Sequence, residues 1–387
     1  MSEHAPVGGK FVTPLTVVLA LLSLVAGVLL VVRFVYGLGA VTNLNDGYTF
    51  GIWVVVDIVI GTAFGCGGFA IALLIYIFNR GQYHPLVRPA VLASLFGYGL
   101  GGTAVIIDLG RWWNFWHIFW PGYAHLDSVM FEVAACVATY ILVLAVEFSP
   151  AVLERFGLRG LHKILDKMLF VFIALGVLLP AMHQSSLGTL MVIAGHQIHP
   201  LWQTTALPVL FLVSAITMGF SVVVFEATMA AEGFRRPRET LILGQVSVVT
   251  AWLLAAFLVV RFADLVLRGE LGAVFAGGYL SLMFVIETAL FALPVAILAA
   301  PASRASPRLL FVAAVSAMVA GALYRIDTYL VAYNPGDQFS YFPSVPEMLV
   351  TVGLISFEIL AYLFLVRFLP VLHRVEPEGA PAPVSSP

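Results

Sequence analysis

Ten apolar runs, each long enough to cross a membrane, limit this chain to one class of fold. A helix of about 20 apolar residues spans the hydrocarbon core of a bilayer. A transmembrane β-barrel would instead need short segments of alternating hydrophobicity. We therefore predict an all-α integral membrane protein with ten transmembrane helices. The expected spans are residues 14–36, 52–78, 86–109, 128–149, 163–183, 206–230, 241–263, 279–300, 307–332 and 347–370.

The composition agrees with a chain that lies mostly inside a bilayer. Of its 387 residues, 61 % are hydrophobic and only 10 % are charged. A soluble domain averages about 25 % charged residues, so a soluble globular protein is excluded. The chain has 19 basic and 21 acidic residues and therefore lacks the basic surface of a nucleic-acid-binding protein. We expect contact with membrane lipid and no nucleic-acid partner.

Lysine and arginine residues sort between the two sides of the predicted helices. The N-terminus, the even-numbered loops and the C-terminus carry fourteen of them, and the other side carries five. The positive-inside rule then places both termini in the cytoplasm. A Pro-, Ser- and Ala-rich stretch at residues 375–387 is expected to be a disordered cytoplasmic tail after a membrane domain of residues 1–374.

Ionisable residues inside apolar spans are candidates for function, because each costs about 2.5–3.5 kcal/mol at the centre of a membrane helix. Asp57 and Glu132 lie inside spans without an oppositely charged neighbour in the sequence. Desolvation favours the protonated form of such a carboxyl group, so it can exchange protons near neutral pH. Glu287 also lies toward the outer end of its helix. Three further glutamates lie deeper or toward the inner helix ends, namely Glu147, Glu226 and Glu358.

Three arginine–aspartate combinations occur near the outer ends of the spans. They are Asp108 with Arg111, Arg261 with Asp264, and Arg325 with Asp327. Members of the first pair are three residues apart, so on a continuing helix they share a face and can form an ion pair. We expect the second pair to be structural, whereas the first can be structural or functional.

The nine histidines are expected in loops or at helix ends rather than in the middle of a span. A b-type haem in a helix bundle needs axial ligands that project from facing helices, so we predict no bound haem. The two cysteines, Cys66 and Cys136, cannot hold an iron–sulfur cluster, and no metal site is expected. His183 is predicted to end the fifth span, where it and Gln184 can hydrogen-bond a carbonyl ligand.

Two other patterns concern packing. The strongly aromatic stretch of residues 111–120 is typical of a membrane-interface belt, which can also dock a partner at the outer face. Gly61 with Gly65, and Gly97 with Gly101, have the spacing that lets helices approach closely.

These features fit a hydrophobic carrier of two electrons and two protons, such as a quinone, because its ring oxygens need hydrogen-bond donors and its protons need titratable groups. The electrons would come from or go to a separate subunit. A proton-coupled transporter would use similar residues, but it predicts helices broken by Gly or Pro at the midplane, and the sequence indicates few of these. A haem cytochrome is the third alternative.

Several motifs resemble the NrfD/PsrC family of membrane subunits, and within it the HybB-type membrane subunits of periplasmic nickel–iron hydrogenases. The similarity extends over essentially the whole chain. The motifs that carry it are residues 79–89, 95–98, 108–111, 182–186, 199–203 and 334–336.

The resemblance implies two four-helix bundles plus two flanking helices in a bacterial inner membrane. It also implies a menaquinone, bound as a substrate near the periplasmic side, and a ferredoxin-like iron–sulfur subunit on that face, fed by the large and small subunits of a nickel–iron hydrogenase. The chain itself would not oxidise H2 but would be the site of menaquinone reduction. The residues carried over from the motifs as quinone-binding are Asp108, Arg111, His183 and Gln184, and Asp57 and Glu132 are added on physical grounds.

The leading hypothesis is therefore a quinone-reactive anchor subunit of a respiratory hydrogenase in anaerobic respiration. Protons would reach the quinone through Glu147, Glu226, Glu287 and Glu358, and a cytoplasmic origin of these protons would couple the reaction to proton translocation. The alternatives are the membrane subunit of another quinone-linked oxidoreductase and a proton-coupled transporter.

Overall fold

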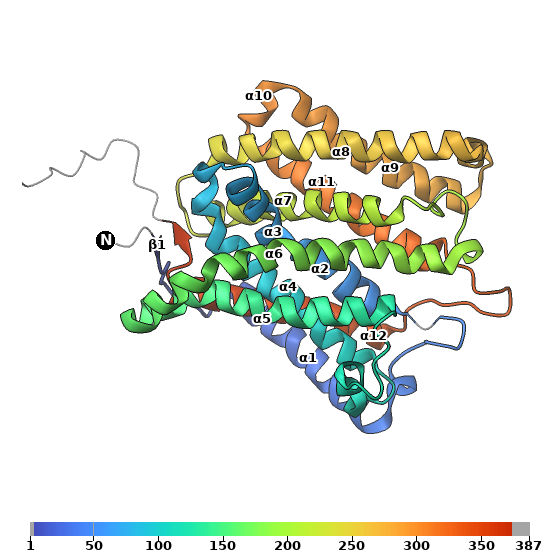
Figure 1. Ribbon diagram of the computed structural model, residues 1–387, viewed down its shortest axis with the longest axis horizontal. Helices are drawn as coiled ribbons and strands as arrows, with labels where there is room; N and C mark the ends of the chain where they lie inside the picture. Colours follow the sequence, from blue (N-terminus) through green and yellow to red (C-terminus); the bar gives the residue numbers. More distant parts are fainter. Residues whose placement is uncertain (1–3, 49, 374–387) are drawn as a thin grey trace, which may run out of the picture.

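The computed structural model describes residues 4–48 and 50–373 (Figure 1). The predicted tail, residues 375–387, lies outside the described residues. Within them, ten helical segments are long and apolar enough to cross a membrane, which confirms the predicted all-α membrane fold. These segments are Pro14–Tyr36, Trp53–Ile77, Gly81–Asp108, Val129–Phe156, Met168–Gln197, Leu207–Gly233, Thr240–Arg268, Gly278–Ala299, Pro307–Val331 and Val345–Phe368.

Most of these segments are single α-helices, and a few contain π-helical or 3-10 stretches. The α-helices are α1 (Pro14–Tyr36), α2 (Gly61–Phe64), α3 (Gly67–Ala72), α4 (Val87–Asp108), α5 (Val129–Phe156), α6 (Arg159–Ala194), α7 (Leu207–Gly233), α8 (Thr240–Arg268), α9 (Gly278–Ala299), α10 (Pro301–Arg304), α11 (Pro307–Ile326) and α12 (Val345–Phe368). The π-helical segments are η2 (Trp53–Ile60), η3 (Leu73–Ile77) and η8 (Asp327–Val331). The 3-10 segments are η1 (Leu38–Ala40), η4 (Gly81–Leu86), η5 (Trp112–Phe119), η6 (Gly195–Gln197) and η7 (Glu270–Phe275).

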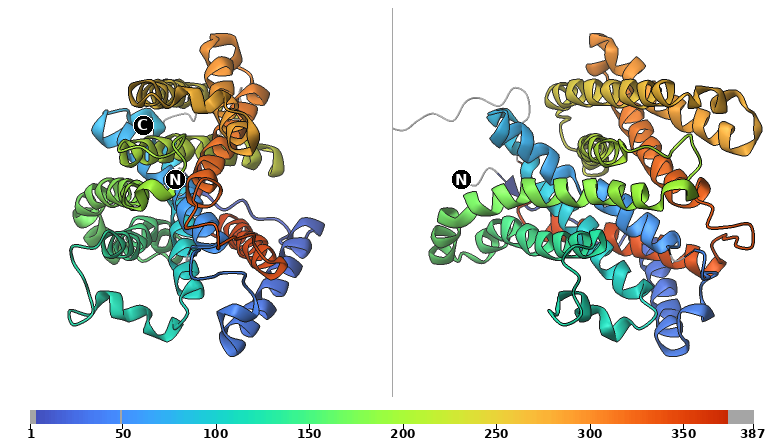
Figure 2. Two further views of the ribbon diagram at one scale, coloured as in Figure 1. Left: turned by 90° about the vertical axis from the view of Figure 1, so that its right-hand side faces the viewer. Right: turned by 45° about the vertical axis from the view of Figure 1, so that its right-hand side comes forward.

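The helices form two four-helix bundles and a flanking pair, as Figures 1 and 2 show. The second span (η2 to η3), α4, α5 and α6 form the first bundle, in which the second span and α5 each contact α4 and α6. Helices α7, α8, α9 and α11 form the second bundle, and α6 and α3 contact α7 between the two. Helix α1 packs along α12 at the side of the first bundle. This is the arrangement that the resemblance implied.

The two described chain ends meet at one end of the molecule. Strand β1 (His4–Ala5) pairs antiparallel with strand β2 (Leu372–His373), so that His4 lies opposite His373. We call this the inner end and the opposite one the outer end; in Figure 1 they are on the left and on the right.

The hydropathy pattern predicted one continuous helix for the second span, but the structure shows an interrupted one. It runs through η2, α2, a turn at Gly65 and Cys66, α3 and η3. A Cβ atom on Gly97 of α4 would lie 2.7 Å from the carbonyl oxygen of Gly61, and one on Gly219 of α7 would lie 2.6 Å from the carbonyl oxygen of Cys66. The interrupted span therefore packs backbone against backbone with two neighbours, and the sequence-based expectation of little midplane breakage is wrong here.

Helix α6 extends well beyond its predicted end at residue 183. The hydroxyl groups of Ser186 and Thr189 donate to the carbonyl oxygens of Met182 (2.8 Å) and Ser185 (3.1 Å), four residues earlier in each case. The polar residues thus satisfy their hydrogen bonds inside the helix and let it continue to Ala194.

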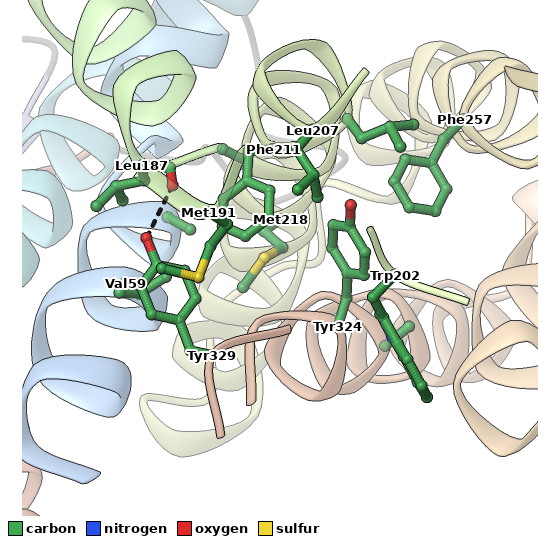
Figure 3. Close-up of a cluster of buried hydrophobic side chains, with 14 of the residues drawn as sticks. Val59, Leu187, Met191, Trp202, Leu207, Phe211, Met218, Phe257, Tyr324 and Tyr329 are labelled. Carbon is green, nitrogen blue, oxygen red and sulfur yellow. Dashed lines mark hydrogen bonds between the residues drawn. The ribbon is translucent and has the colours of Figure 1, made fainter. Parts of the chain in front are cut away.

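A hydrophobic core joins the two bundles (Figure 3). Phe211 and Met218 of α7 pack with Tyr324 of α11, and the hydroxyl of Tyr329 donates to the Leu187 carbonyl oxygen at 2.8 Å. His183, Gln184 and Arg325, which are described next, are fully buried beside this core.

We expect Gly97→Ala to destabilise the protein, because the added methyl group would overlap the backbone of the second span. Such overpacking costs about 1–3 kcal/mol. The thermal unfolding midpoint of the purified protein in detergent should fall. The matched control is Gly99→Ala on the same helix, where an added Cβ has no neighbour within 4 Å. An unchanged midpoint for Gly97→Ala would show that the helices are not held at this contact.

Candidate functional site

A fully buried arginine on α11 links four of the membrane spans. The Arg325 Nε donates to the Val59 carbonyl oxygen at 2.9 Å. Its Nη2 donates to Gln184 Oε1 and to the Phe211 carbonyl oxygen, both at 3.2 Å, and its Nη1 donates to Ser214 Oγ at 3.1 Å. One guanidinium group therefore binds the second span, α6 and α7 at the same time.

The positive charge of Arg325 has no carboxylate in ion-pair contact among the described residues. It lies over the ring of Phe211, with the guanidinium carbon 5.0 Å from the ring centroid. Carbonyl dipoles, an amide, a hydroxyl and an aromatic face stabilise the cation instead. A ligand oxygen that gains negative charge beside it would be stabilised, because no protein anion within the described chain neutralises the field.

Thr62 connects this arginine to His183. The Thr62 hydroxyl donates to the Ile58 carbonyl oxygen at 2.5 Å, and Gln184 Nε2 donates to Thr62 Oγ1 at 3.0 Å. Since the single hydroxyl proton is used, His183 Nε2, also 3.0 Å away, acts as the donor to Thr62 Oγ1. His183 Nδ1 is then a buried acceptor with no hydrogen-bond partner among the described residues.

We call Thr62, His183, Gln184, Ser214 and Arg325 the central polar cluster. The ring of Tyr98 lies 5.6 Å from that of His183, centroid to centroid. His183 and Gln184 are 0 % exposed and lie ten or eleven residues before the end of α6. At 1.5 Å per residue this depth is about 16 Å below the outer end of the helix. His183 is therefore in the interior of its span, and the prediction that it ends the span is wrong.

A second buried cluster lies inside the second bundle. Arg261 of α8 forms an ion pair with Glu287 of α9, and the Trp202 indole donates to the other Glu287 carboxylate oxygen at 2.9 Å. The Arg261 guanidinium also lies over the ring of Tyr324, 5.0 Å from its centroid. Asp327 faces Glu287. We call these five residues the second-bundle cluster.

Two of the predicted quinone-binding carboxylates lie on the other side of the second span. Asp57 is 1 % exposed, and neither of its carboxylate oxygens has a hydrogen-bond partner within the described chain. It lies within electrostatic reach of Asp108 and of Glu358 on α12. The nearby Arg33 donates to two carbonyl groups at the end of α4, at 2.5 and 2.6 Å. Asp57 and Asp108 therefore lie within electrostatic reach of each other, but the structure joins neither to the central polar cluster.

The structure joins neither Arg111 nor Glu132 to the central polar cluster or to Asp57 and Asp108. Arg111 is exposed beyond the end of α4, and Glu132 is partly buried in the first turn of α5. Of the six predicted quinone-binding residues, the structure unites only His183 with Gln184 and Asp57 with Asp108.

Within the described structure, none of the three predicted arginine–aspartate pairs forms. Helix α4 ends at Asp108, so the three-residue spacing to Arg111 no longer places the two side chains on one helical face. Residues 325 and 327 are two apart and point in different directions. Arg261 turns inward to Glu287, while Asp264 bonds to Arg268 at the outer end. The observed ion pairs are Arg261 with Glu287 and Arg268 with Asp264.

The four glutamates of the predicted proton path lie on four helices, and no hydrogen bond between described residues joins any two of them. Glu147 packs against Gly176 of α6, where an added Cβ would meet its carboxylate at 2.5 Å. Glu287 belongs to the second-bundle cluster, and Glu358 faces Asp57.

Glu226 lies at a pocket of about 40 Å³ near the inner end. The Tyr362 hydroxyl donates to its carboxylate. Arg236 and Glu239 line the same pocket, and burial raises the pKa of Glu239 while Arg236 opposes the rise. The pocket thus joins a membrane carboxylate to charged groups at the inner helix ends.

Sequence reasoning missed Thr62 and Ser214, which are uncharged, and treated Arg325 as a partner of Asp327. The only local signal for Thr62 is a hydroxyl residue within an apolar run between Gly61 and Gly65. The described residues include no group of three or more His, Cys, Asp or Glu that could hold a metal ion.

Relatives of this chain include proteins named as subunits of a hydrogenase, a menaquinone reductase and a selenate reductase. The chain is 45 % identical to the probable Ni/Fe-hydrogenase 2 b-type cytochrome subunit of Escherichia coli, over 96 % of this chain and 95 % of that protein. It is 27 % identical to the integral membrane subunit of menaquinone reductase from Nitratidesulfovibrio vulgaris, over 87 % and 86 %. It is 22 % identical to a selenate reductase subunit of Mesobacillus selenatarsenatis, over 95 % and 97 %.

The prediction that no haem is bound is contradicted by the name of the Escherichia coli relative, since a b-type cytochrome is a haem protein. Its premise also fails, because His183 lies inside a span. His183 is a buried imidazole with an unpartnered nitrogen, as one axial ligand would be. The described side chains supply no second fully buried histidine, so they do not complete a bis-histidine site.

Membership of a family rests on a match over most of the chain. The family model described as polysulphide reductase, NrfD, matches residues 40–333. That range begins just before the second span and ends after the ninth, so it contains both four-helix bundles. Together with the 45 % identity to the Escherichia coli protein, the match shows that this chain, an integral membrane protein with ten apolar helices, belongs to the polysulphide reductase NrfD family.

Proposed function

We propose that this chain is the quinone-reactive membrane subunit of an oxidoreductase complex, and more specifically the anchor subunit of a respiratory nickel–iron hydrogenase that reduces menaquinone. The names of the relatives support this proposal, because they include a hydrogenase subunit and a menaquinone reductase subunit. The chain would lie in a bacterial inner membrane with both termini in the cytoplasm, as the distribution of Lys and Arg favours.

The observation that carries the proposal is the central polar cluster. Arg325 is a buried cation without a carboxylate partner in the described structure, and beside it His183 presents an unpartnered Nδ1. A quinone ring oxygen needs a hydrogen-bond donor before reduction and bears a proton after it. In the tautomer that Thr62 fixes, His183 Nδ1 accepts a hydrogen bond from the quinol hydroxyl, and it donates to a quinone oxygen once the imidazole has taken up a proton.

The roles of the individual residues follow from their contacts. Arg325 stabilises negative charge that develops on the quinone oxygen during electron transfer. His183 orients the ring and exchanges a proton with that oxygen, while Thr62 fixes the imidazole through Nε2. Gln184 binds both Arg325 and Thr62 and so sets the distance between the cation and the imidazole. Two electrons come from the partner, and two protons complete the quinol.

A ferredoxin-like iron–sulfur subunit would dock at the outer end and receive electrons from the large and small hydrogenase subunits. The 3-10 segment η5 supports this placement, because Trp113, Phe115 and Trp116 are exposed at the outer end of α4. Aromatic residues are enriched in the cores of protein interfaces, and the same side chains also suit the membrane surface.

Protons would reach the quinone site through the buried carboxyl groups. The pocket beside Glu226 favours an entry point at the inner end, since it brings charged groups of the helix ends next to a membrane carboxylate. Protons taken up from the cytoplasm would cross part of the membrane to reach the central polar cluster, and this charge movement would make quinone reduction electrogenic.

We expect His183→Ala to lower H2-dependent menaquinone reduction by the whole complex about 100-fold, because general acid–base groups typically contribute that much or more. Reduction of a soluble dye by the hydrogenase subunits should be unchanged. His84→Ala, which removes an exposed histidine at the inner end, is the control and should leave both rates intact. Native menaquinone reduction by His183→Ala would exclude this site.

Gln184→Glu tests the charge of Arg325 rather than its shape. The new carboxylate has the size of the amide and would lie 3.2 Å from Arg325 Nη2. It would neutralise the cation, so we expect kcat for menaquinone reduction to fall at least about tenfold while the complex remains assembled. An unchanged kcat, with assembly verified by gel filtration, would show that the field of Arg325 does not act on the substrate.

Proton uptake from the inner side predicts that Glu147→Gln and Glu226→Gln reduce the membrane potential generated per H2 oxidised, in vesicles or proteoliposomes that hold the complex. The expected loss is about half or more for the combined variant, because proton uptake from the inner side is the step of the proposed reaction that moves charge across the membrane. Glu232→Gln, an exposed glutamate paired with Arg238 at the same end, is the control. A native potential in the combined variant would contradict this route.

A further inference from the structure

The second-bundle cluster contains more negative than positive charge. Arg261 is 3 % exposed, whereas Glu287 and Asp327 are both 0 % exposed. Two ionised carboxylates beside one guanidinium would leave a net negative charge inside the helix bundle, which is strongly unfavourable in a low-dielectric interior. One added proton balances the charges.

The hydrogen bonds point to where this proton lies. Glu287 accepts from Arg261 with one oxygen and from Trp202 with the other. Asp327 has no donor partner for either oxygen among the described residues, and the carboxyl group that it faces is that of Glu287. Two ionised carboxylates are acceptors only, so a hydrogen bond between them requires a shared proton.

Two further buried donors lie at the same place without a partner in the described structure. They are the Tyr324 hydroxyl and Arg261 Nη2. The Tyr324 ring stacks against the Arg261 guanidinium, and Figure 3 shows Tyr324 enclosed between Phe211 and Phe257, with Trp202 beside it. Buried polar groups that lack protein partners are usually satisfied by an internal water molecule.

We propose that Glu287 and Asp327 share one proton and act as a proton-storing site inside the second bundle. Tyr324 and Arg261 Nη2 bind the water molecule that connects this site to its surroundings. The charged and titratable groups that face the site are Arg261 and Asp264 from α8, Glu287 from α9, and Tyr324 and Arg325 from α11. Arg268 and Thr204 hold the Asp264 carboxylate at the outer end, so it does not take part in the shared hydrogen bond.

That this proton is used in quinone reduction rests on the proposed function. That Glu287 and Asp327 share a proton is independent of the proposed function. When the site supplies a proton, the O–H bond between the two carboxyl groups breaks and the proton passes through water to the reduced quinone oxygen. A proton from the aqueous phase then restores the pair. Asp327 begins a π-helical segment two residues after Arg325, so the site and the central polar cluster adjoin on one helix.

Infrared difference spectroscopy of the purified complex tests the shared proton without any quinone chemistry. We expect the wild-type protein to show a protonated-carboxyl stretch that is absent from Asp327→Asn. The same band should be absent from Glu287→Gln, because the remaining single carboxyl group ionises next to Arg261. Asp264→Asn is the control and should retain the band. Retention of the band in Asp327→Asn would overturn the proposal.

Asp327→Asn should fold, because the ion pair between Arg261 and Glu287 is left in place and becomes charge-balanced. If Glu287→Gln does not assemble, the protonated-carboxyl band can still be compared between Asp327→Asn and Asp264→Asn. That comparison alone shows whether the band depends on Asp327. Menaquinone reduction by Asp327→Asn should fall at least about tenfold. If Asp327→Asn lost the band but reduced menaquinone at the native rate, the stored proton would not be the one supplied to the quinone. Whether the quinone binds at the central polar cluster is tested separately with His183→Ala.

Discussion

The need to stabilise a guanidinium group deep in the membrane organises the centre of this protein. Arg325 is fully buried, and acceptors on the second span, α6 and α7 satisfy its donors. Each buried donor or acceptor left unpaired in such an environment would cost about 1–3 kcal/mol. The four segments must therefore keep a fixed relative position, and this fixes the seam between the two bundles. The same requirement leaves a positive field at the place where a substrate oxygen could bind.

The irregular second span follows from the close packing around this seam. Glycines on α4 and α7 bring their backbones against the turn at Gly65 and Cys66, and the π-helical turn before it carries the carbonyl group that Arg325 binds. Another π-helical segment begins at Asp327. π-helical turns within α-helices are frequent at functional sites. Here one lies in the second span, whose carbonyl group Arg325 binds, and the other begins two residues after Arg325 on its own span.

Hydropathy and loop charges were sufficient to predict the ten spans, and the resemblance supplied the two bundles and the flanking pair. His183 and Gln184 were found because they stand together in one motif. The remaining contacts of the cluster could not be predicted, since Arg325 binds Val59 across 266 residues of sequence and Ser214 across 111. The end of α6 was misplaced because Gln184 and the serines after it lower the hydropathy, although the serine hydroxyls bond within the helix. Local spacing also favoured ion pairs between near neighbours, whereas Arg261 pairs with Glu287 on another helix.

The central claim is that the quinone ring binds at the central polar cluster. It is tested most directly by locating the ring in an experimental density map of the complete complex prepared with menaquinone. We predict ring density near the middle of the membrane, with one ring oxygen within hydrogen-bond distance of His183 Nδ1 and near Arg325. Ring density at another position, with the cluster as closely packed as it is here, would contradict the account.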